Sequence, residues 1–231
     1  TQKGPFFKMA ATFLERYIGY GKPFQLGFGF PNNRAMRVAE HLKLYAEVDK
    51  ICAISWPASS SRPHLFTCLR EINHDNIEHY AANIDQLWQL MRQDLKNSII
   101  GIRDYKYILS RYLNHPEYSY QIVAIKSRFS QKLQGILILK NTKLRFEIID
   151  IISSIKHIPL LIHQAQRLSN LHNHKQLHCL ITAGFATLFE TNQSHCEHTD
   201  IRIPANIWSA GPEIERIKDH WWLMSGDMDC R

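Results

Sequence analysis

Apolar side chains recur along this chain at two spacings, about 3.6 residues in some segments and about 2 in others. Residues 6–17 carry the helical spacing and end at "IGYGKP", where two glycines and a proline stop a helix. The apolar run "FQLGFGF" then predicts a short buried strand over residues 24–30. Helical spacing returns in "NRAMRVAEHLKLY", for which Asn33 is a candidate N-cap.

Two further strands are predicted before residue 73, "KICAISW" and "HLFTCLREI", with the turn-rich "PASSSRP" between them. Residues 1–72 thus form a unit of loop, helix, strand, helix and two strands. Its first strand has no earlier segment to pair with. Its first helix has no strand leading into it, although a helix that follows a glycine turn normally has one, as in a βα unit.

The pattern restarts at about residue 73. "NIDQLWQLMRQDLKN" predicts an amphipathic helix with Asn83 and Gln86 at capping-box spacing, and Asp104 is expected to cap the next helix. The remaining segments predict a hairpin, a third strand, a helix, a strand, a short helix and two closing strands, in the order "YSYQIVAIK", "QGILILK", "LRFEIIDII", "IPLLIHQAQRLSNLH", "QLHCLITA", "GFATLFETN", "IRIPANIWS" and "WWLMSGD". We therefore predict a mixed α/β (α+β) fold in which helices flank largely antiparallel sheets.

Composition narrows the class of protein. The 231 residues are 45% hydrophobic and 21% charged, as in ordinary soluble domains. No apolar run approaches the ~18 residues of a membrane span, so no membrane association is expected. The five cysteines are odd in number and lack CxxC spacing. Without a secretory signal, these features favour free thiols in a reducing cytoplasm.

The net charge of +7 raises the question of a nucleic-acid or phosphate ligand. The 28 Lys and Arg residues are scattered, however, and form no run of five or six like charges and no RNA-recognition motif. We therefore favour a basic surface with a local phosphate site over nucleic acid as the main partner.

The segments "TQKGPFFKMAATFLERY" and "FQLGFGFPNNRAMRVAEHLKLY" resemble the second half of a GNAT-superfamily N-acetyltransferase domain. The opening resembles the family's acyl-CoA pyrophosphate loop, in which free amides and the positive end of a helix dipole bind an anion. Thr1 replaces the family's usual Gln or Arg, Phe6 takes the second small position, and Pro5 removes one amide. The resemblance implies that acetyl-CoA, as co-substrate, binds at Gln2, Lys3, Gly4, Pro5, Phe6, Phe7, Asn32 and Asn33. A plain loop-to-helix junction at Gly4 and a turn with an N-cap at Asn32-Asn33 are the alternatives.

Two later segments, "IGIRDYKYILSRYLNHPEYSY" and "WWLMSGDMDCR", resemble a branch of the superfamily with two GNAT-like halves in tandem. This implies that residues 1–72 are the C-terminal half of an acyl-CoA-binding domain and that residues 73–231 are a second, degenerate GNAT-like domain. Thr1 would then lie inside a domain, and the chain would be a fragment of a longer polypeptide. We expect the second domain to brace the first or shape its substrate pocket, without binding acyl-CoA at the Gly184 turn.

The resemblance implies that the whole protein transfers an acetyl group to a primary amine of a small molecule or sugar. Many GNATs place a Tyr seven residues after the Asn that ends the strand, but Ala39 stands there. In those enzymes the Tyr acts as the acid that protonates the departing CoA thiolate. Here the thiolate leaves without an acid, another group such as Tyr45 serves as the acid, or this copy is not catalytic. No catalytic residue is therefore assigned, and the chain alone is expected to be inactive. The alternatives are a non-catalytic GNAT-derived binding or scaffolding module and a nucleic-acid-binding protein.

Three other groups of polar residues have side chains that could form a site. "LHNHKQLHC" and "SHCEHTD" contain good zinc ligands, but they match neither HExxH nor CxxC, so we expect a polar loop and a helix end rather than a metal site. Asp227 and Asp229 would share one face of a strand, as a cation or amine site or as an exposed edge. Arg103, Asp104 and Arg111 are expected to form caps and ion pairs.

Overall fold

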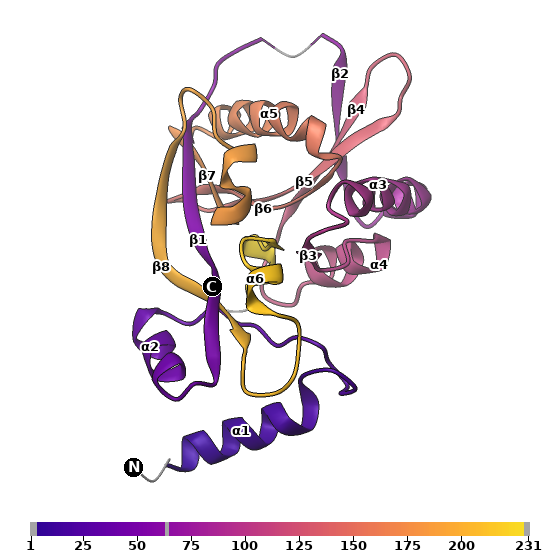
Figure 1. Cartoon of the computed structure of the whole chain (residues 1–231). Coiled ribbons are helices and arrows are strands. Elements are labelled where there is room, and N and C mark those ends of the chain that lie inside the picture. The colour runs from indigo at the N-terminus through magenta and orange to yellow at the C-terminus, as the bar shows by residue number, and fades with distance from the viewer. Residues whose placement is uncertain (1–3, 63–64, 229–231) are drawn as a thin grey trace.

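The computed structural model describes residues 4–62 and 65–228 and is built on one seven-stranded sheet (Figure 1). The strand order across the sheet is β2-β4-β5-β6-β7-β1-β8, and every neighbouring pair is antiparallel except β6 and β7. This arrangement confirms the predicted mixed, largely antiparallel fold. The strands are β1 (Tyr45–Pro57), β2 (Thr67–Ile72), β4 (Gln121–Ser127), β5 (Leu133–Asn141), β6 (Phe146–Ser153), β7 (Gln176–Thr182) and β8 (His195–Asn206). A separate two-stranded pair joins β3 (Ile99–Ile100) to β9 (Trp221–Trp222).

Helices pack around this sheet (Figure 1). The α-helices are α1 (Pro5–Tyr17), α2 (Asn33–His41), α3 (Ala81–Asp94), α4 (Tyr105–Ile108), α5 (Ile158–Leu171) and α6 (Ile214–Ile217). Short 3-10 turns are η1 (Ile77–Tyr80), η3 (Ile155–His157), η4 (Ala183–Leu188) and η5 (Ser225–Asp227), and a π-turn, η2 (Leu109–Leu113), continues α4. Helices α3 and α5 both contact β5 and β6, whereas α1 lies at the far end of the molecule, away from the sheet.

The core is centred on β6, whose eight residues are all buried. A strand covered on both faces is apolar along nearly its whole length rather than alternating, as "FEIIDIIS" is. Close packing continues on β5, where Gly135 faces Leu161 of α5 so closely that a Cβ would collide with that leucine. The absence of a side chain at Gly135 therefore lets α5 approach the sheet.

The strand predicted over residues 24–30 is absent. In the described part of the chain, residues 25–30 take part in no backbone–backbone hydrogen bond, and Phe24 and Phe28 are 61% and 48% exposed. The chain reaches the open outer edge of β8 only after this segment, where the Arg202 amide donates to the Pro31 carbonyl at 3.1 Å and Asn32 bridges Ile201. The two glycines within this segment also weaken its strand propensity.

Several element ends differ from prediction. Asn32, not Asn33, caps α2, because its side chain accepts a hydrogen bond from the Ala35 amide at 3.0 Å. The helix ends at His41 rather than at Tyr45, since Lys43 has a positive φ that turns the chain into β1. The capping box at Asn83 is also wrong, because α3 begins earlier, directly after η1.

The seven-stranded sheet takes strands from both sides of residue 72. β2 pairs with β4 at one edge, and β1 lies between β7 and β8 near the other. The division into 1–72 and 73–231 stays a prediction, as does the tandem arrangement. No helix in the described residues has both the length and the apolar character needed to cross a bilayer.

Candidate functional site

The first part of the predicted anion site is the start of α1. Gly4 is the N-cap, has an extended backbone and carries no side chain that could accept from the first amides. The first turn contains no acidic residue, and a Cβ placed on Gly4 would meet nothing within 4 Å. The positive end of the α1 dipole is thus available to an anion. Gln2 and Lys3, also predicted to bind the cofactor, lie outside the described residues.

The two phenylalanines predicted beside this loop differ in role. Phe6 is 56% exposed at the start of α1. Phe7 is buried, and its ring packs edge-on against Trp208 with 5.2 Å between centroids. Phe7, Leu14 and Ile18 belong to a small apolar cluster with Leu44, which fixes α1 to the segment entering β1. Phe7 therefore holds the helix in place, while Phe6 remains on the surface beside Gly4.

The second part of the predicted site is the start of α2. The Asn32 side chain caps this helix by accepting a hydrogen bond from the Ala35 amide, so one of the helix's free amides is already satisfied. A hollow of about 580 Å³ opens there, lined by Asn32, Asn33, Arg34, Arg37, Val38 and Asp200. Its two arginines are exposed and form no ion pair within the described residues. The sequence analysis did not name Arg34 or Arg37 as site residues, although two cations in the first turns of a capped helix indicate a possible anion site.

A second helix start, after β6, is closed by the chain itself. Asp94, at the end of α3, accepts hydrogen bonds from the Ser154 hydroxyl at 2.6 Å and from the Ile155 amide at 2.9 Å. These groups begin η3, which leads directly into α5. An anion at this position would have to displace the Asp94 carboxylate. Sequence gave no sign of this contact, which joins residues about sixty positions apart.

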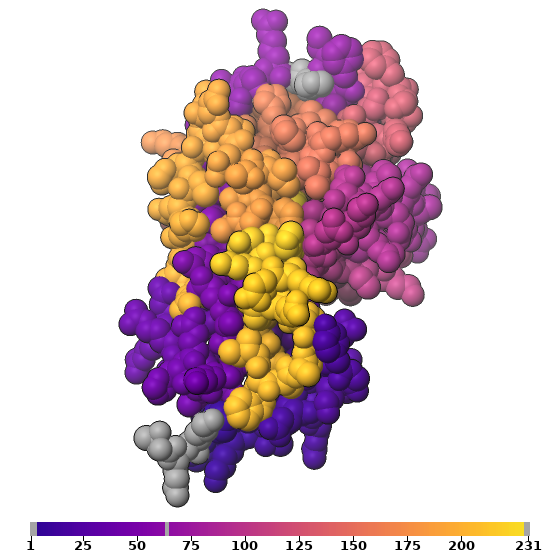
Figure 2. All heavy atoms as spheres, viewed as in Figure 1, coloured from indigo at the N-terminus to yellow at the C-terminus, as the bar shows by residue number. Residues whose placement is uncertain are grey.

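The parallel strands β6 and β7 pair at only three positions, Phe146–Ile148 with Leu177–Cys179, near the start of each strand. Residues 221–228 also contact both strands. On the β7 side, Met224 bridges Ile181, and the Thr182 amide donates to the Leu223 carbonyl at 3.1 Å. On the β6 side, the Ser225 hydroxyl donates to Glu147 at 2.8 Å. Figure 2 shows this C-terminal region in yellow, between the magenta α3–α4 region and the orange β7–η4 region.

A buried charge network anchors the same segment. The Arg103 guanidinium is fully buried and donates to Asp150 at 3.0 Å and to Asp227 at 2.6 Å. Burial lowers the pKa of Arg103, but the two carboxylates outweigh burial and raise that pKa above its ordinary value, so the arginine stays charged. Burial raises the pKa of Tyr112, whose protonated hydroxyl donates to Asp150 at 2.8 Å.

Three of the other candidate residues form contacts of known geometry. Arg103 forms the ion pairs expected of it, and Asp104 caps α4 by accepting from the Tyr107 amide at 2.8 Å. Asp227 is not an open carboxylate on a strand: it lies in η5 and accepts from Arg103 and from the Met224 amide. Asp229 lies outside the described residues.

Gly184 is explained by close packing. A Cβ on Gly184 would collide with the backbone of Asp219, and its amide faces the buried Asp49 carboxylate at 3.4 Å. The expectation that acyl-CoA does not bind at this turn stays a prediction.

The histidine-rich stretches are used in packing and hydrogen bonding. His172 and His174 contact the Phe146 ring, with centroids 5.3 and 5.7 Å away, and both contact the Asn141 amide group. His198 lies 3.2 Å from the Cys52 sulfur. The described residues contain no group of three or more His, Cys, Asp or Glu side chains arranged to hold a metal ion.

No protein-family model and no curated protein sequence matches the chain. Its fold does match solved structures. A GCN5-related N-acetyltransferase from Anabaena variabilis has a TM-score of 0.54 at 12% identity, over 88% of this chain and 50% of that one. One from Sphaerobacter thermophilus has a TM-score of 0.53 at 12% identity, over 81% and 61%. A protein from Enterococcus faecalis described as a probable N-acyltransferase has a TM-score of 0.59 at 12% identity, over 88% and 48%.

At this identity the matches show the fold, and they confirm the fold that the sequence resemblance predicted. The chain spans 48% to 61% of the length of these structures. The binding role of the predicted cofactor residues stays a prediction.

Proposed function

We propose, from the GCN5-related N-acetyltransferase fold that this chain adopts, that it is part of an acyl-CoA-dependent N-acyltransferase. The donor is acetyl-CoA, as the sequence resemblance implies, and the acceptor is a primary amine on a small molecule or a sugar. The amine nitrogen attacks the thioester carbonyl, the carbon–sulfur bond breaks, and the amine proton ends on the departing thiolate. The products are an N-acetyl amide and free CoA.

The observation that carries this proposal is the difference between the two helix starts. Gly4 leaves the start of α1 without a side-chain cap or an acidic neighbour, whereas Asp94 fills the start of η3. A pyrophosphate binds where amides and a helix dipole point at a space free of negative charge. In this proposal the α1 start binds the pyrophosphate, and Arg34 and Arg37 attract the remaining phosphate of CoA. No residue of this chain is assigned as base or acid.

The cellular location proposed is the cytoplasm. Cys52, Cys68 and Cys196 form no disulfide in the described residues, which supports a reducing compartment.

Thermal unfolding with and without acetyl-CoA tests the binding step. A ligand at about a hundred times its Kd stabilises the folded state by about 2.7 kcal/mol, so acetyl-CoA should raise Tm. Gly4→Asp should abolish that increase, because the new carboxylate repels phosphate. The same change should not lower the Tm of the ligand-free chain, since Asp is a good N-cap.

Asp94→Asn is the matched control, because it keeps an acceptor for Ser154 and Ile155 and should retain protection by acetyl-CoA. Equal protection of the native chain and Gly4→Asp would overturn the proposed location. Absence of protection in the native chain would overturn the proposal that this chain binds acetyl-CoA. Where protection is found, an amine panel with thiol detection of released CoA then measures turnover.

A further inference from the structure

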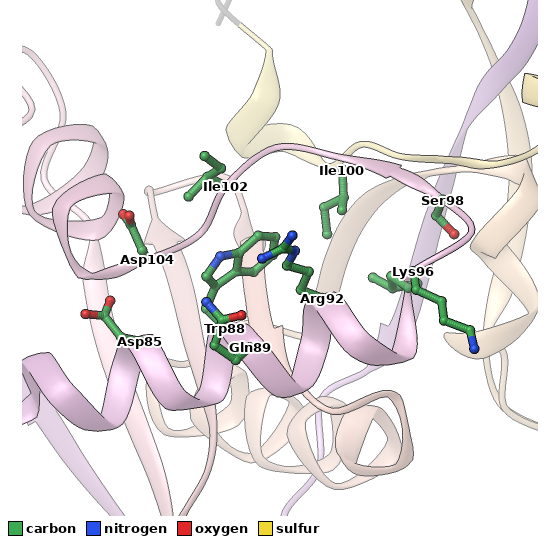
Figure 3. Close-up of a pocket in the computed structure, with 10 residues that line it drawn as sticks. Asp85, Trp88, Gln89, Arg92, Lys96, Ser98, Ile100, Ile102 and Asp104 are labelled. Atoms are coloured by element: carbon green, nitrogen blue, oxygen red, sulfur yellow. The ribbon is translucent and has the colours of Figure 1, made fainter. Parts of the chain in front are cut away.

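A groove of about 750 Å³ lies between α3 and the extended segment of residues 98–104 (Figure 3). On the α3 side, the lining residues Asp85, Trp88 and Arg92 recur at helical spacing and so share one face. On the other side, Ile100, Ile102 and their neighbours line the groove at every second position, as in a strand. The groove therefore has one helical wall and one extended wall.

The middle of the groove is apolar. Trp88 is only 5% exposed, and Ile100 is half-buried on the opposite wall. Ile102, at the rim, is 63% exposed although polar residues surround the opening. An occupant with an aliphatic group would cover this isoleucine and remove apolar surface from water.

One end of the groove is acidic. Asp85 and Asp104 come from opposite walls, and each uses one carboxylate oxygen to accept a backbone amide of α4, from Tyr105 and Tyr107 respectively, at 2.8 Å. The second oxygen of each carboxylate has no hydrogen-bond partner within the described residues. Two carboxylates held in place with free oxygens favour a cationic group such as an amine.

The other end of the groove is basic. Arg92 lies near Trp88 in Figure 3, and Lys96 lies beyond it at the far end of α3. Neither side chain forms an ion pair in the part of the chain that the structure describes. Seven residues separate Asp85 from Arg92, which is about 10 Å along a helix axis. An extended peptide covers that length with about three residues.

We propose that this groove binds a short peptide with free termini, of about three residues. Its amino group lies between Asp85 and Asp104, its carboxylate pairs with Arg92, and a central aliphatic side chain packs on Ile102. Charge complementarity at the two ends sets the direction of the peptide. The site is independent of the acyl-CoA site proposed above and does not rest on it.

Calorimetric titration of the whole chain with the tripeptide Ala-Leu-Ala tests the proposal. We expect the free tripeptide to bind at millimolar concentration or below, and N-acetylation or C-amidation each to weaken binding by about tenfold through loss of one charged contact. Arg92→Gln should weaken binding of the free peptide by a similar factor. It should leave the affinity of the C-amidated peptide unchanged, because that peptide has no carboxylate to pair.

Lys106→Gln is the matched control: it removes one exposed cation on α4 outside the groove and should leave all affinities unchanged. Ile102→Asp should abolish binding of every form, and circular dichroism checks that the variant is folded. Equal affinities for free and blocked peptides, or no heat of binding to the folded native chain at 5 mM Ala-Leu-Ala (a concentration on the order of the weakest binding expected), would overturn the proposal.

Discussion

The start of α1, an α-helix, and the start of η3, a 3-10 turn that leads into α5, differ in whether a carboxylate closes them. Both are loop-to-helix junctions whose first amides lack an intrahelical partner. At α1, Gly4 contributes no side chain and no acid follows in the first turn. At η3, a carboxylate from another helix accepts from the first amide. One acidic residue, which lies outside the local sequence, therefore decides whether a helix start is closed or remains available to an anion.

The contrast extends beyond the helix starts. The region after β6 is closed by its own residues, with 221–228 bonded to both β6 and β7. The α1 region is open, and α1 carries a second apolar stripe that faces solvent, formed by Phe6, Met9, Phe13 and Tyr17. Exposed apolar stripes of this kind mark contact surfaces. The region after β6 therefore has its polar groups paired within the chain, whereas the α1 region exposes an apolar surface and an uncapped helix start.

The strongest way to break the closed region is to remove its buried charge. Arg103→Met leaves Asp150 and Asp227 without their cationic partner, and we expect a loss of about 3–5 kcal/mol in the free energy of unfolding. Urea titration measures the shift in midpoint. Arg216→Met is the control, because its pair with Glu213 is exposed and should contribute little. Equal shifts for both variants would show that the closed region does not depend on the network.

A second test measures how stability depends on pH, to which the buried Asp49 carboxylate contributes. Asp49 is 3% exposed and Asp94 is exposed, and burial raises the pKa of Asp49 to about 6 from an ordinary 3.8. The folded state therefore binds this proton more tightly than the unfolded state does. The contribution of Asp49 to stability is therefore greatest below about pH 4, falls as pH rises to about 6, and is then flat, with a total change of about 3 kcal/mol.

Asp49→Asn checks this assignment, because it should flatten the stability profile between pH 4 and 7. It should also make the chain more stable than the native one at pH 7.5, where the native carboxylate is charged. Denaturant midpoints across that range measure both effects. An unchanged slope in Asp49→Asn would assign the pH dependence to another group.

The substitution with the smallest expected effect removes the carboxylate that closes the start of η3. Asp94→Ala removes the acceptor for Ser154 and Ile155, and we expect a loss of about 1–2 kcal/mol, as for a lost helix cap. Pyrophosphate should then raise the Tm of Asp94→Ala more than that of the native chain, because the vacated amide faces an anion. If pyrophosphate protects both equally, the carboxylate is not what closes this start.

Sequence patterns predicted the elements whose periodicity is local and long. The run over β6 and the helical spacing over α5 each specify their element within about ten residues, and both are present. The strand predicted over 24–30 is absent because an apolar run does not report which residues lie beside a sheet edge, and the chain meets the edge of β8 only from Pro31 and Asn32 onward. Asn32 and Asn33 are equally good caps by residue type, so only the backbone geometry could choose between them.

The candidate site divides in the same way. The loop-to-helix junction at Gly4 was predicted because a glycine turn before a helix is a local signal, and Gly4 is the N-cap of α1. Ion pairs were expected for Arg103, but its partners and the Asp94 contact were not predicted, since the paired residues lie 47 to 124 positions apart in sequence. Which charges are buried together is a property of the whole sheet. The wall formed by residues 98–104 was missed because its alternating pattern was shorter than a recognisable strand.

The place of β1 in the sheet has a consequence for synthesis. β1 ends at Pro57, but its neighbours β7 and β8 span residues 176–206, so its edges stay unpaired until most of the chain has left the ribosome. The hairpins joining β4, β5 and β6 close over short loops and form early, because local pairing carries a small entropic cost. Until β8 emerges, β1 is an open strand and therefore the segment most in need of chaperone protection.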